Sequence, residues 1–338
     1  MQMPAKKSIP LGGTEMILTI DGGTTNTRIY LMQDGEICAV HKMAVGIRDT
    51  LQTDGKKRFF TVIAEKIAKL TKEYTIEAIL CSGMIGSETG LYNCPHTATP
   101  VSFADLAKQM RQVSLPDIAD VPFWFIPGIK TFSDLPESAS EISIGLLAEM
   151  DIMRGEETEI VGICAGMGLT GERTYVLPGS HMKTVSMNAE GKITTFHTSL
   201  TGELLHAVAE HTILQASVKQ AYPKTVAPEQ LRQGYAMAQA YGMAQALFKV
   251  RILDKSVGGL TPDELYALLM GILLQEDVSR LIRENCPVCI AGSDPFRSAY
   301  RILLTDGGIP TVDIPEKLAE CASAYGAWHL WQLRTAKL

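Results

Sequence analysis

The sequence predicts an α/β protein of two lobes, each of which begins with a β-hairpin. The chain has 338 residues, more than one ordinary domain of about 100–200 residues requires. Stretches with the two-residue alternation of strands are interleaved with stretches of helical periodicity. A strand, loop and strand pattern near the start also returns 156 residues later, which indicates a duplicated unit.

The first lobe is expected over residues 16–170, after an N-terminal extension over residues 1–15 that we expect to be flexible. Alternating or apolar runs predict its strands, and helical spacing predicts its helices. The expected strands are 16–21, 27–32, 36–43, 76–83 and 121–128, and the expected helices are 56–72, 103–113 and most of 141–163. The apolar face of the first of these helices is formed by Phe60, Ile63, Ile67 and Leu70.

The second lobe is expected over residues 171–338 and repeats the opening hairpin. Its later strands are expected at 287–293 and near 311–314, and its helices at 201–216, 227–251, 262–284 and from Pro295 and Pro315. A shift of 156 residues without a gap places Gly23 on Gly179, Thr24 on Ser180 and Gly46 on Gly202. Because these matches fall at expected turns, where small residues are most useful, we interpret them as a duplication with each hairpin loop facing the other lobe.

Composition restricts the class of partner. The net charge is −6 and no block of Lys and Arg stands out, which argues against nucleic acid and against a membrane surface. No apolar run reaches the roughly 18 residues of a membrane span, and the start lacks the apolar core of a secretory signal. Seven cysteines, an odd number, suit a reducing compartment, so we expect a cytoplasmic protein. Self-association into a homo-oligomer stays open.

The one close cysteine pair, Cys286 and Cys289, lacks the second pair that a zinc ribbon requires. We therefore favour buried structural thiols over a metal or redox site.

The first hairpin loop, "DGGTTNT" at residues 21–27, has the composition of an anion site. A glycine-rich turn directs several backbone N–H groups toward one point, and threonine hydroxyls add donors for phosphate oxygens. Asp21, at the end of the strand, can hold a Mg²⁺-bound water beside those phosphates. A simple turn is the alternative, but it needs neither three threonines nor an aspartate.

Two other nucleotide motifs do not fit. No P-loop signature is present. Residues 166–171, "GMGLTG", match the dinucleotide fingerprint, but a strand follows them where that motif needs a helix. We reject NAD binding and interpret this segment as a hinge between the lobes.

The second hairpin loop, "LPGSHMK" at residues 177–183, supplies Ser180, His181 and Lys183. Lys183 can offset charge on a phosphoryl group, or it can be a solvated lysine on a hairpin, and the sequence leaves both open. The charge run at residues 153–160, with Arg154, Glu156 and Glu157, has the composition of a solvated helix start.

Three features, the loop "DGGTTNTR", the second glycine hairpin and the late segment "VCIAGSDPF", resemble the two phosphate segments and the adenosine segment of the actin, Hsp70 and sugar-kinase superfamily. Four motifs give a narrower resemblance: "CSGMIGS", "FIPGIK", "DIMRGEET", and "LPGSHMK" with "TGEL". In this order they are similar to the 2-dehydro-3-deoxygalactonokinases of the actin, Hsp70 and sugar-kinase superfamily. The resemblance implies a two-lobed actin-like ATPase (ribonuclease H-like) fold with an interlobe cleft. It also implies transfer of the γ-phosphoryl group of Mg-ATP to a small-molecule sugar acid, 2-keto-3-deoxygalactonate, to give its 6-phosphate.

The resemblance assigns roles to residues of this chain. Asp21, Lys183 and Arg154 are the implied catalytic residues, with Asp21 also toward Mg²⁺. The implied ATP-binding residues are Gly22, Gly23, Thr24, Thr25, Gly179, Ser180, Gly292 and Ser293. The implied substrate-binding residues are Gly83, Met84, Ile85, Gly86, Ser87 and His181. A second carboxylate, Glu156 or Glu157, is left open.

The chain departs from the family pattern in two places. Residues 88–91 read "ETGL" where relatives tend to have Arg-Gln-Gly-Trp, and Thr184 replaces a tryptophan. Glu88 beside an anionic substrate would cost affinity in a poorly screened cleft. A kinase of the same fold for another hydroxyl compound is therefore one rival, and an ATP-binding sensor without catalysis is the other.

Overall fold

The computed structural model describes residues 16–51, 55–133, 138–219 and 222–336, so the expected extension over residues 1–15 lies outside it. The chain divides into two compact units. The first unit contains the described residues up to Leu169 and those from Cys321 onward, and the second is Thr170–Glu320. The expected second lobe ran to residue 338, whereas the structure returns the end of α11 (Glu316–Thr335) to the first unit.

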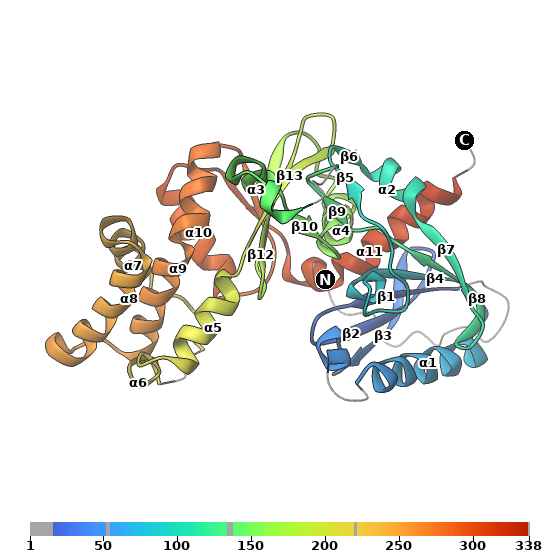
Figure 1. Ribbon diagram of the computed structural model, residues 1–338, viewed down its shortest axis with the longest axis horizontal. Coiled ribbons are helices and arrows are strands. Elements are labelled where there is room, and N and C mark those ends of the chain that lie inside the picture. Colours follow the sequence, from blue (N-terminus) through green and yellow to red (C-terminus); the bar gives the residue numbers. More distant parts are fainter. Residues whose placement is uncertain (1–15, 52–54, 134–137, 220–221, 337–338) are drawn as a thin grey trace. The chain divides into compact units, whose positions relative to one another are not determined.

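The first unit contains a six-stranded sheet in the order β3-β2-β1-β4-β8-β7 (Figure 1). Its strands are β1 (Met16–Gly22), β2 (Thr27–Gln33), β3 (Glu36–Met43), β4 (Ile76–Gly83), β7 (Arg111–Leu115) and β8 (Ala119–Phe125). β1 runs antiparallel to β2 and parallel to β4, and β4 runs parallel to β8. The expected hairpin of strands 16–21 and 27–32 is therefore confirmed, and so are the expected strands 36–43 and 76–83.

Side chains of the central strands alternate between two packed faces, as the two-residue period of a strand requires. Leu18, Ile20, Ile29 and Leu31 belong to the core that includes α1 (Gly55–Glu73). On α1 the face that enters this core contains Phe59, which is 1% exposed, in place of the expected Phe60. Tyr30 and Met32 point to the other face, where Ala324 and Trp328 of α11 cover them. This packing explains why the last helix belongs to the first unit.

Two expected helices of the first unit are shorter than predicted. α2 (Phe103–Gln109) ends because Met110 takes an extended ψ of 137°, and the next residues form β7 instead. Pairing of β7 with β8 outweighs the helical pattern of residues 110–113. The region 141–163 contains α3 (Ile144–Glu149), then β10 (Ile152–Met153), and then the first residues of α4 (Glu156–Met167).

A small sheet in the order β10-β9-β5 accompanies the large one. Its other strands are β9 (Ile129–Lys130) and β5 (Thr97–Ala98). The motif "FIPGIK" runs from the end of β8 into β9, so it connects the two sheets.

The second unit repeats the strand order of the first. Its five strands pair in the order β13-β12-β11-β14-β15, and their bounds are β11 (Arg173–Leu177), β12 (Met182–Met187), β13 (Lys192–Ser199), β14 (Val288–Ile290) and β15 (Thr311–Asp313). As in the first unit, the opening hairpin is antiparallel and the later strands are parallel to β11. This repeat supports the duplication.

The gapless overlay needs one correction. Gly22 pairs with Thr27 at the first loop, whereas Leu177 pairs with Lys183 at the second. Residues 23–26 thus close the first hairpin and residues 178–182 the second, so the second loop is one residue longer.

Helices make up most of the remainder of the second unit (Figure 1). They are α5 (Thr201–His211), α6 (Gln215–Val218), α7 (Pro228–Tyr241), α8 (Met243–Ile252), α9 (Pro262–Glu284) and α10 (Phe296–Asp306). The expected helix 201–216 is thus two helices, and 227–251 is broken at Gly242, whose φ is 75°. α9 is the central helix, because its buried residues contribute much of the core of this unit.

The repeated strand order confirms the expected actin-like α/β fold class. Within the described ranges, no helix is both long and apolar enough to cross a membrane.

Candidate active site

The first hairpin loop has a fixed backbone and exposed donors. The amide of Gly23 donates to the carbonyl oxygen of Asn26 at 2.9 Å, and Arg48 N–H donates to the carbonyl oxygen of Thr24 at 2.9 Å. Thr24 and Thr25 are exposed, whereas the hydroxyl of Thr27 is buried and donates to Val45 O at 2.8 Å. Two of the three threonines are therefore available to an anion, and the third holds the loop in place.

Both hairpin loops rest on a glycine that follows the hairpin. A Cβ on Gly46 would lie 2.5 Å from the carbonyl oxygen of Thr24, and one on Gly202 would lie 2.0 Å from that of Gly179. Neither position admits a side chain, because both distances are shorter than any van der Waals contact. The two loops therefore have equivalent support, as the matched positions of the sequence predict.

Asp21 is the acidic residue of the first loop. Its Oδ2 lies 3.3 Å from Nη1 of Arg28, and its side chain is 15% exposed. It also accepts a hydrogen bond from Ser323 of α11. Burial raises the pKa of Asp21, while Arg28 and the Ser323 hydroxyl act in the opposite direction. The carboxylate therefore sits in a nearly dry site where a cation would stabilise its charge.

Glu157, at the acidic start of α4, is buried, so the interpretation of this segment as a solvated helix start is wrong for this residue. This side chain is fully buried and accepts hydrogen bonds from Gly155 N–H at 2.8 Å and from the Thr158 hydroxyl at 3.0 Å. Burial, followed by the charge of Glu156, raises the pKa of Glu157 to about 7. Burial and the charge of Asp21 also raise the pKa of Glu159 well above its usual range. Asp21 and the α4 glutamates therefore form one acidic cluster.

The segment expected to bind the sugar adjoins this cluster. A Cβ on Gly83 would lie 3.4 Å from Oδ1 of Asp21, and one on Gly155 would lie 3.2 Å from Cα of Gly83. Gly83 therefore lies between Asp21 and the start of α4 and is close to both.

The other members of the segment have different surroundings. Ile85 is fully buried and supports Gly22, whose Cβ would lie 2.7 Å from Cβ of Ile85. Ser87 donates to the carbonyl oxygen of Met84 at 2.7 Å. Glu88 is exposed. The backbone of the turn and Ser87 are thus better placed to meet a ligand than the side chain of Ile85 is.

Arg154 extends from just before α4 toward the same turn. Its Nη2 donates to the carbonyl oxygen of Cys94 at 2.6 Å and lies 3.3 Å from both ring nitrogens of His96. Its Nη1 is buried without a hydrogen-bond partner, 3.2 Å from where a Cβ on Gly86 would lie. Burial, then Arg154 and Lys130, lower the pKa of His96 to about 4, so the imidazole is neutral. His96 was not among the residues that the sequence indicated.

In the second unit, the interpretation of Lys183 as a solvated lysine is wrong. Lys183 is 5% exposed, and its Nζ donates to the hydroxyl of Thr198 at 2.7 Å across β12 and β13. Ser180 and His181 at the loop tip are exposed, and His181 lies 3.4 Å from Glu203 of α5. The loop therefore combines exposed polar groups with a buried cation.

Gly292 and Ser293 follow β14 and adjoin the second loop. A Cβ on Gly292 would lie 3.2 Å from Cδ of Pro178, and Ser293 is exposed. Asp294 then accepts the backbone N–H of Ser298 at 3.1 Å, which caps the first turn of α10. The carboxyl ends of β11 and β14 thus present neighbouring loops.

A buried network behind the second loop was not expected from the sequence. Asp277 of α9 is 6% exposed and accepts hydrogen bonds from Ser199 at 2.7 Å and Thr201 at 3.0 Å. Tyr300 of α10 donates to the same oxygen at 3.4 Å. Because Ser199 follows Thr198, the partner of Lys183, the network fixes the strand end that holds this lysine. No local signal marks it, since its members come from distant segments.

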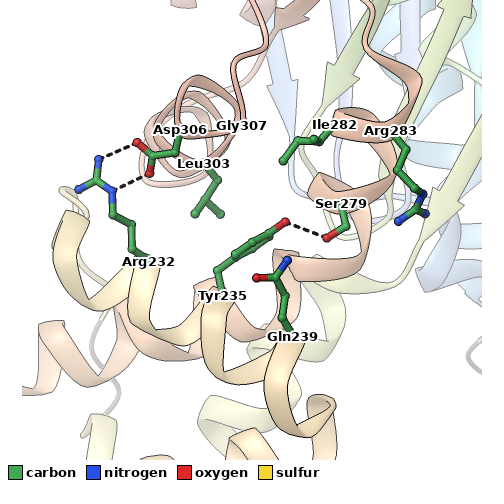
Figure 2. Close-up of a pocket in the computed structure, with 9 residues that line it drawn as sticks. All are labelled: Arg232, Tyr235, Gln239, Ser279, Ile282, Arg283, Leu303, Asp306 and Gly307. Atoms are coloured by element: carbon green, nitrogen blue, oxygen red, sulfur yellow. Dashed lines mark hydrogen bonds and ion pairs between the residues drawn. The ribbon is translucent and has the colours of Figure 1, made fainter.

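A separate pocket of about 510 Å³ lies among α7, α9 and α10 (Figure 2). Figure 2 shows the ion pair between Arg232 and Asp306, at 2.6 Å, and the hydrogen bond between Tyr235 and Ser279, at 2.8 Å. None of the residues expected to bind a ligand lines it.

Of the close cysteine pair, Cys289 is buried as expected, whereas Cys286 is only partly buried. All seven cysteines are free thiols, and Cys289 is 1% exposed within β14. Across the described residues, no group of three His, Cys, Asp or Glu side chains is arranged to hold a metal ion.

Known proteins resemble this chain over most of its length. The probable 2-dehydro-3-deoxygalactonokinase of Rhizobium meliloti (strain 1021) is 28% identical over 327 residues, which cover 93% of this chain and 97% of that protein. The 2-dehydro-3-deoxygalactonokinase of Escherichia coli (strain K12) is 26% identical over 269 residues, covering 79% of this chain and 81% of the relative.

A crystal structure solved for a Sinorhizobium meliloti protein, under the name 2-dehydro-3-deoxygalactonokinase, has the same fold. The two superpose with a TM-score of 0.75 at 23% identity, covering 95% of this chain and 98% of the other. The family described as 2-keto-3-deoxy-galactonokinase matches residues 21–330, a span that includes both hairpin loops and the acidic start of α4. The chain therefore belongs to the 2-keto-3-deoxy-galactonokinase family.

Proposed function

We propose that this chain transfers the γ-phosphoryl group of ATP to a hydroxyl of 2-keto-3-deoxygalactonate and forms the 6-phosphate. The observation that carries the proposal is the first hairpin loop, where exposed Thr24 and Thr25 adjoin the largely buried Asp21, in a member of this family. Rigid loops with exposed N–H and hydroxyl donors bind phosphate oxygens without reorganising, which is what phosphoryl transfer requires.

In this proposal neutral hydrogen-bond donors bind the phosphates and the carboxylate binds the metal ion. Gly22, Gly23, Thr24 and Thr25 hold phosphate oxygens, and Asp21 holds Mg²⁺ through a water or directly. The fit is reasonable, because Mg²⁺ in such sites takes one or two carboxylates together with nucleotide oxygens, and the dry Asp21 carboxylate gains by meeting a cation. When bound, the ion neutralises charge on the phosphates.

Lys183 is the residue of the second unit to which we assign a role toward the transferred phosphoryl group. Its ammonium is held by Thr198 in a site with little water, where a fixed charge acts more strongly on a phosphoryl group than it would in solvent. In this proposal turnover depends on both the Asp21 carboxylate and the Lys183 ammonium.

The exposure of Glu88 weakens the argument for a different substrate. An exposed carboxylate is screened by water and salt, so its charge costs an anionic substrate less than a buried one would. The alternative of another hydroxyl substrate still follows from the altered turn, and a substrate panel separates the two.

The direct test is release of ADP by the purified protein with Mg-ATP and a panel of acceptors. The panel contains 2-keto-3-deoxygalactonate, its gluconate epimer, plain hexoses and polyols. We expect selective turnover with the galactonate compound. Turnover with a different acceptor only would retain the assignment as a kinase and change the assigned substrate. ATP binding without acceptor-dependent release of ADP would favour the ATP-binding sensor.

The Asp21→Asn variant tests the central residue. It keeps the shape of the side chain and removes the charge, so we expect kcat to fall by about 10²-fold or more, the usual cost of one fixed electrostatic group. The melting temperature should stay or rise, because a carboxylate whose pKa is raised by burial destabilises the fold when ionised. Near-normal turnover in a folded variant would remove Asp21 from the mechanism.

A further inference from the structure

The small sheet β10-β9-β5 brings His96, Gly128 and Arg154 into one row. Thr97 pairs with Ile129 in parallel register, and Met153 pairs with Ile129 in antiparallel register. One residue further along, His96 and Arg154 therefore lie on either side of Gly128. A Cβ on Gly128 would lie 2.7 Å from Cδ2 of His96, so the missing side chain is what lets the two flanking residues meet.

The contact between Arg154 and His96 is a stacked one. Nη2 lies 3.3 Å from both Nδ1 and Nε2. An atom equally distant from both nitrogens cannot lie in the ring plane without clashing with a ring carbon, so Nη2 lies over the ring face. Stacking of a guanidinium on an aromatic face is favourable and leaves the in-plane hydrogen-bonding positions of the imidazole nitrogens open.

This pair therefore offers unused hydrogen-bonding groups. In the part of the chain that the structure describes, His96 has no other hydrogen-bond partner, and Nη1 of Arg154 is buried without one. A buried donor left unpaired is destabilising, and a hydrogen bond to a ligand oxygen would remove that cost.

The row also contains two cationic side chains, those of Arg154 and Lys130. Lys130 lies on β9, two residues from Gly128 and so on the same face of the strand. Its Nζ donates to the carbonyl oxygen of Ser133 at 3.3 Å. Among the described residues, no carboxylate forms an ion pair with Arg154 or Lys130. The Glu156 carboxylate accepts the backbone N–H of Arg154 at 3.1 Å, so it is held at the start of α4 and does not pair with the guanidinium. Two cationic side chains and a neutral imidazole thus gather without a side-chain ion pair among the described residues.

We propose that Arg154, His96 and Lys130 form the subsite for the 2-oxo carboxylate end of the sugar acid. The inference rests on the proposed function and assigns the carboxylate to the first unit. In this subsite Arg154 pairs with the carboxylate through its planar fork, His96 donates its ring N–H to the 2-oxo oxygen, and Lys130 adds charge at longer range.

Two features favour a 2-oxo acid over a phosphate group. A neutral imidazole donates one hydrogen bond to a carbonyl oxygen without protonating it, and it adds no charge for a dianion. The turn at Gly83–Gly86 separates the subsite from Asp21, because Gly83 lies beside Asp21 and Gly86 lies beside Arg154. The two ends of a sugar acid can thus be held on either side of this turn. Since Nη1 lies under Gly86, entry of the carboxylate requires the turn to move outward.

The test compares an acid with its neutral analogue. ADP release is measured with 2-keto-3-deoxygalactonate and with the same compound carrying a primary amide in place of the carboxylate. Arg154→Lys and His96→Asn should each raise KM for the acid about tenfold or more, with KM for ATP unchanged and kcat changed only a few-fold. Neither variant should raise KM for the amide further. Arg58→Lys and His41→Asn, on the exposed side of α1 and on β3, are the matched controls.

Gly128→Ala gives an independent variant without altering any charged group. Its Cβ would lie 2.5 Å from the carbonyl oxygen of Met153 and 2.7 Å from Cδ2 of His96, so it displaces both the segment that carries Arg154 and the His96 ring. KM for the acid should therefore rise while KM for the amide stays. Melting curves identify any variant that fails to fold. Equal effects on acid and amide, or a loss confined to kcat, would overturn the carboxylate assignment.

Direct binding separates this inference from the proposed function. Pyruvate, which carries the same 2-oxo carboxylate, is titrated into the protein while the His96 imidazole signals are followed by NMR. We expect pyruvate to shift these signals in the wild type and not in Arg154→Lys. Such a shift without phosphorylation of any sugar acid would keep the subsite and refute the kinase assignment. No shift with pyruvate, or a stronger one with inorganic phosphate, would refute the subsite.

Discussion

Lys183 and Thr198 face each other across β12 and β13, and their contact of 2.7 Å sets the position of a buried ammonium group. A buried cation is costly unless something holds it, and a protein retains one where its charge has a use. At the first loop the sign is reversed, because Asp21 is the buried group and Arg28 its partner. The duplicated hairpins thus carry opposite charges.

Replacement of Lys183 by Met should separate function from stability. We expect turnover to fall by about 10²-fold, as when one preorganised charge is removed, while the melting temperature stays or rises because a desolvated ammonium is lost. Thr198→Val, which keeps the shape and removes only the hydroxyl, should show a smaller loss. If kcat/KM of the Lys183 variant were unchanged, the lysine would have no part in the reaction.

At this scale the sequence indicated those residues that lie close together in the chain. Asp21 and the threonines of the first loop are visible because they are consecutive. His96 and Asp277 are not, since each acquires its partners from segments far away in the sequence. The burial of Glu157 was also missed, because a run of charges has the same composition whether water or protein surrounds it.

Among the elements, α4 and α11 cross through a pair of glycines. A Cβ on Gly162 would lie 1.9 Å from the carbonyl oxygen of Ala322, and one on Gly326 would lie 1.8 Å from that of Thr158. The helices therefore approach until backbone meets backbone. This crossing places the glutamates of α4 and Ser323 of α11 beside Asp21.

Gly326→Ala should separate these two helices. The added methyl group overlaps a backbone oxygen that cannot rotate away, so we expect the free energy of unfolding to fall by about 1–3 kcal/mol. We also expect reduced turnover. Gly145→Ala on α3, where the nearest atom is 4.0 Å away, is the control and should be neutral or slightly stabilising. Urea denaturation measures both, and equal stability of the two variants would show that the crossing tolerates expansion.

Element types followed from periodicity, but several element ends did not. Residues 228–252 have helical spacing throughout, yet the positive φ of Gly242, 75°, divides them into α7 and α8. Residues 111–113 continue the pattern of α2, yet β8 recruits them into a strand. In both cases tertiary contacts or one backbone angle outweigh a propensity of a few tenths of a kcal/mol per residue.

For the whole molecule, the buried acids predict how stability varies with pH. The pKa of Glu157 is raised to about 7 from an ordinary value of 4.5, so the folded chain favours the protonated form. The stability from this group is fully present below pH 4.5 and is lost as the pH rises to about 7. The change amounts to about 3 kcal/mol, at 1.36 kcal/mol for each pKa unit.

Glu157→Gln should remove this pH dependence. The difference in free energy of unfolding between the variant and the wild type should rise by about 3 kcal/mol from pH 4.5 to pH 8. The lost hydrogen bonds of Glu157 add an offset that is the same at every pH, so they do not alter this change. Urea denaturation of both proteins at several pH values gives the difference. Parallel curves across this range would mean that Glu157 titrates normally in the folded chain.

The duplication was the feature of the whole molecule most accessible from sequence. Glycines at matching turns indicated it, and the repeated order of five strands supports it. The extra residue in the second loop and the return of α11 to the first unit were not foreseen. Neither feature can be read from a local sequence pattern. The extra residue depends on the register of the strand pairing, and the place of α11 depends on which unit it packs against.

The return of α11 affects how the protein is made. A ribosome synthesises all strands of the first sheet early, but Ser323 and the residues that cover Tyr30 and Met32 emerge near the end. Residues 170–320 form an uninterrupted unit that is available to fold before then. The half of the molecule encoded first is thus finished last, and a nascent chain carries Asp21 in an incomplete environment until the final helix has left the ribosome.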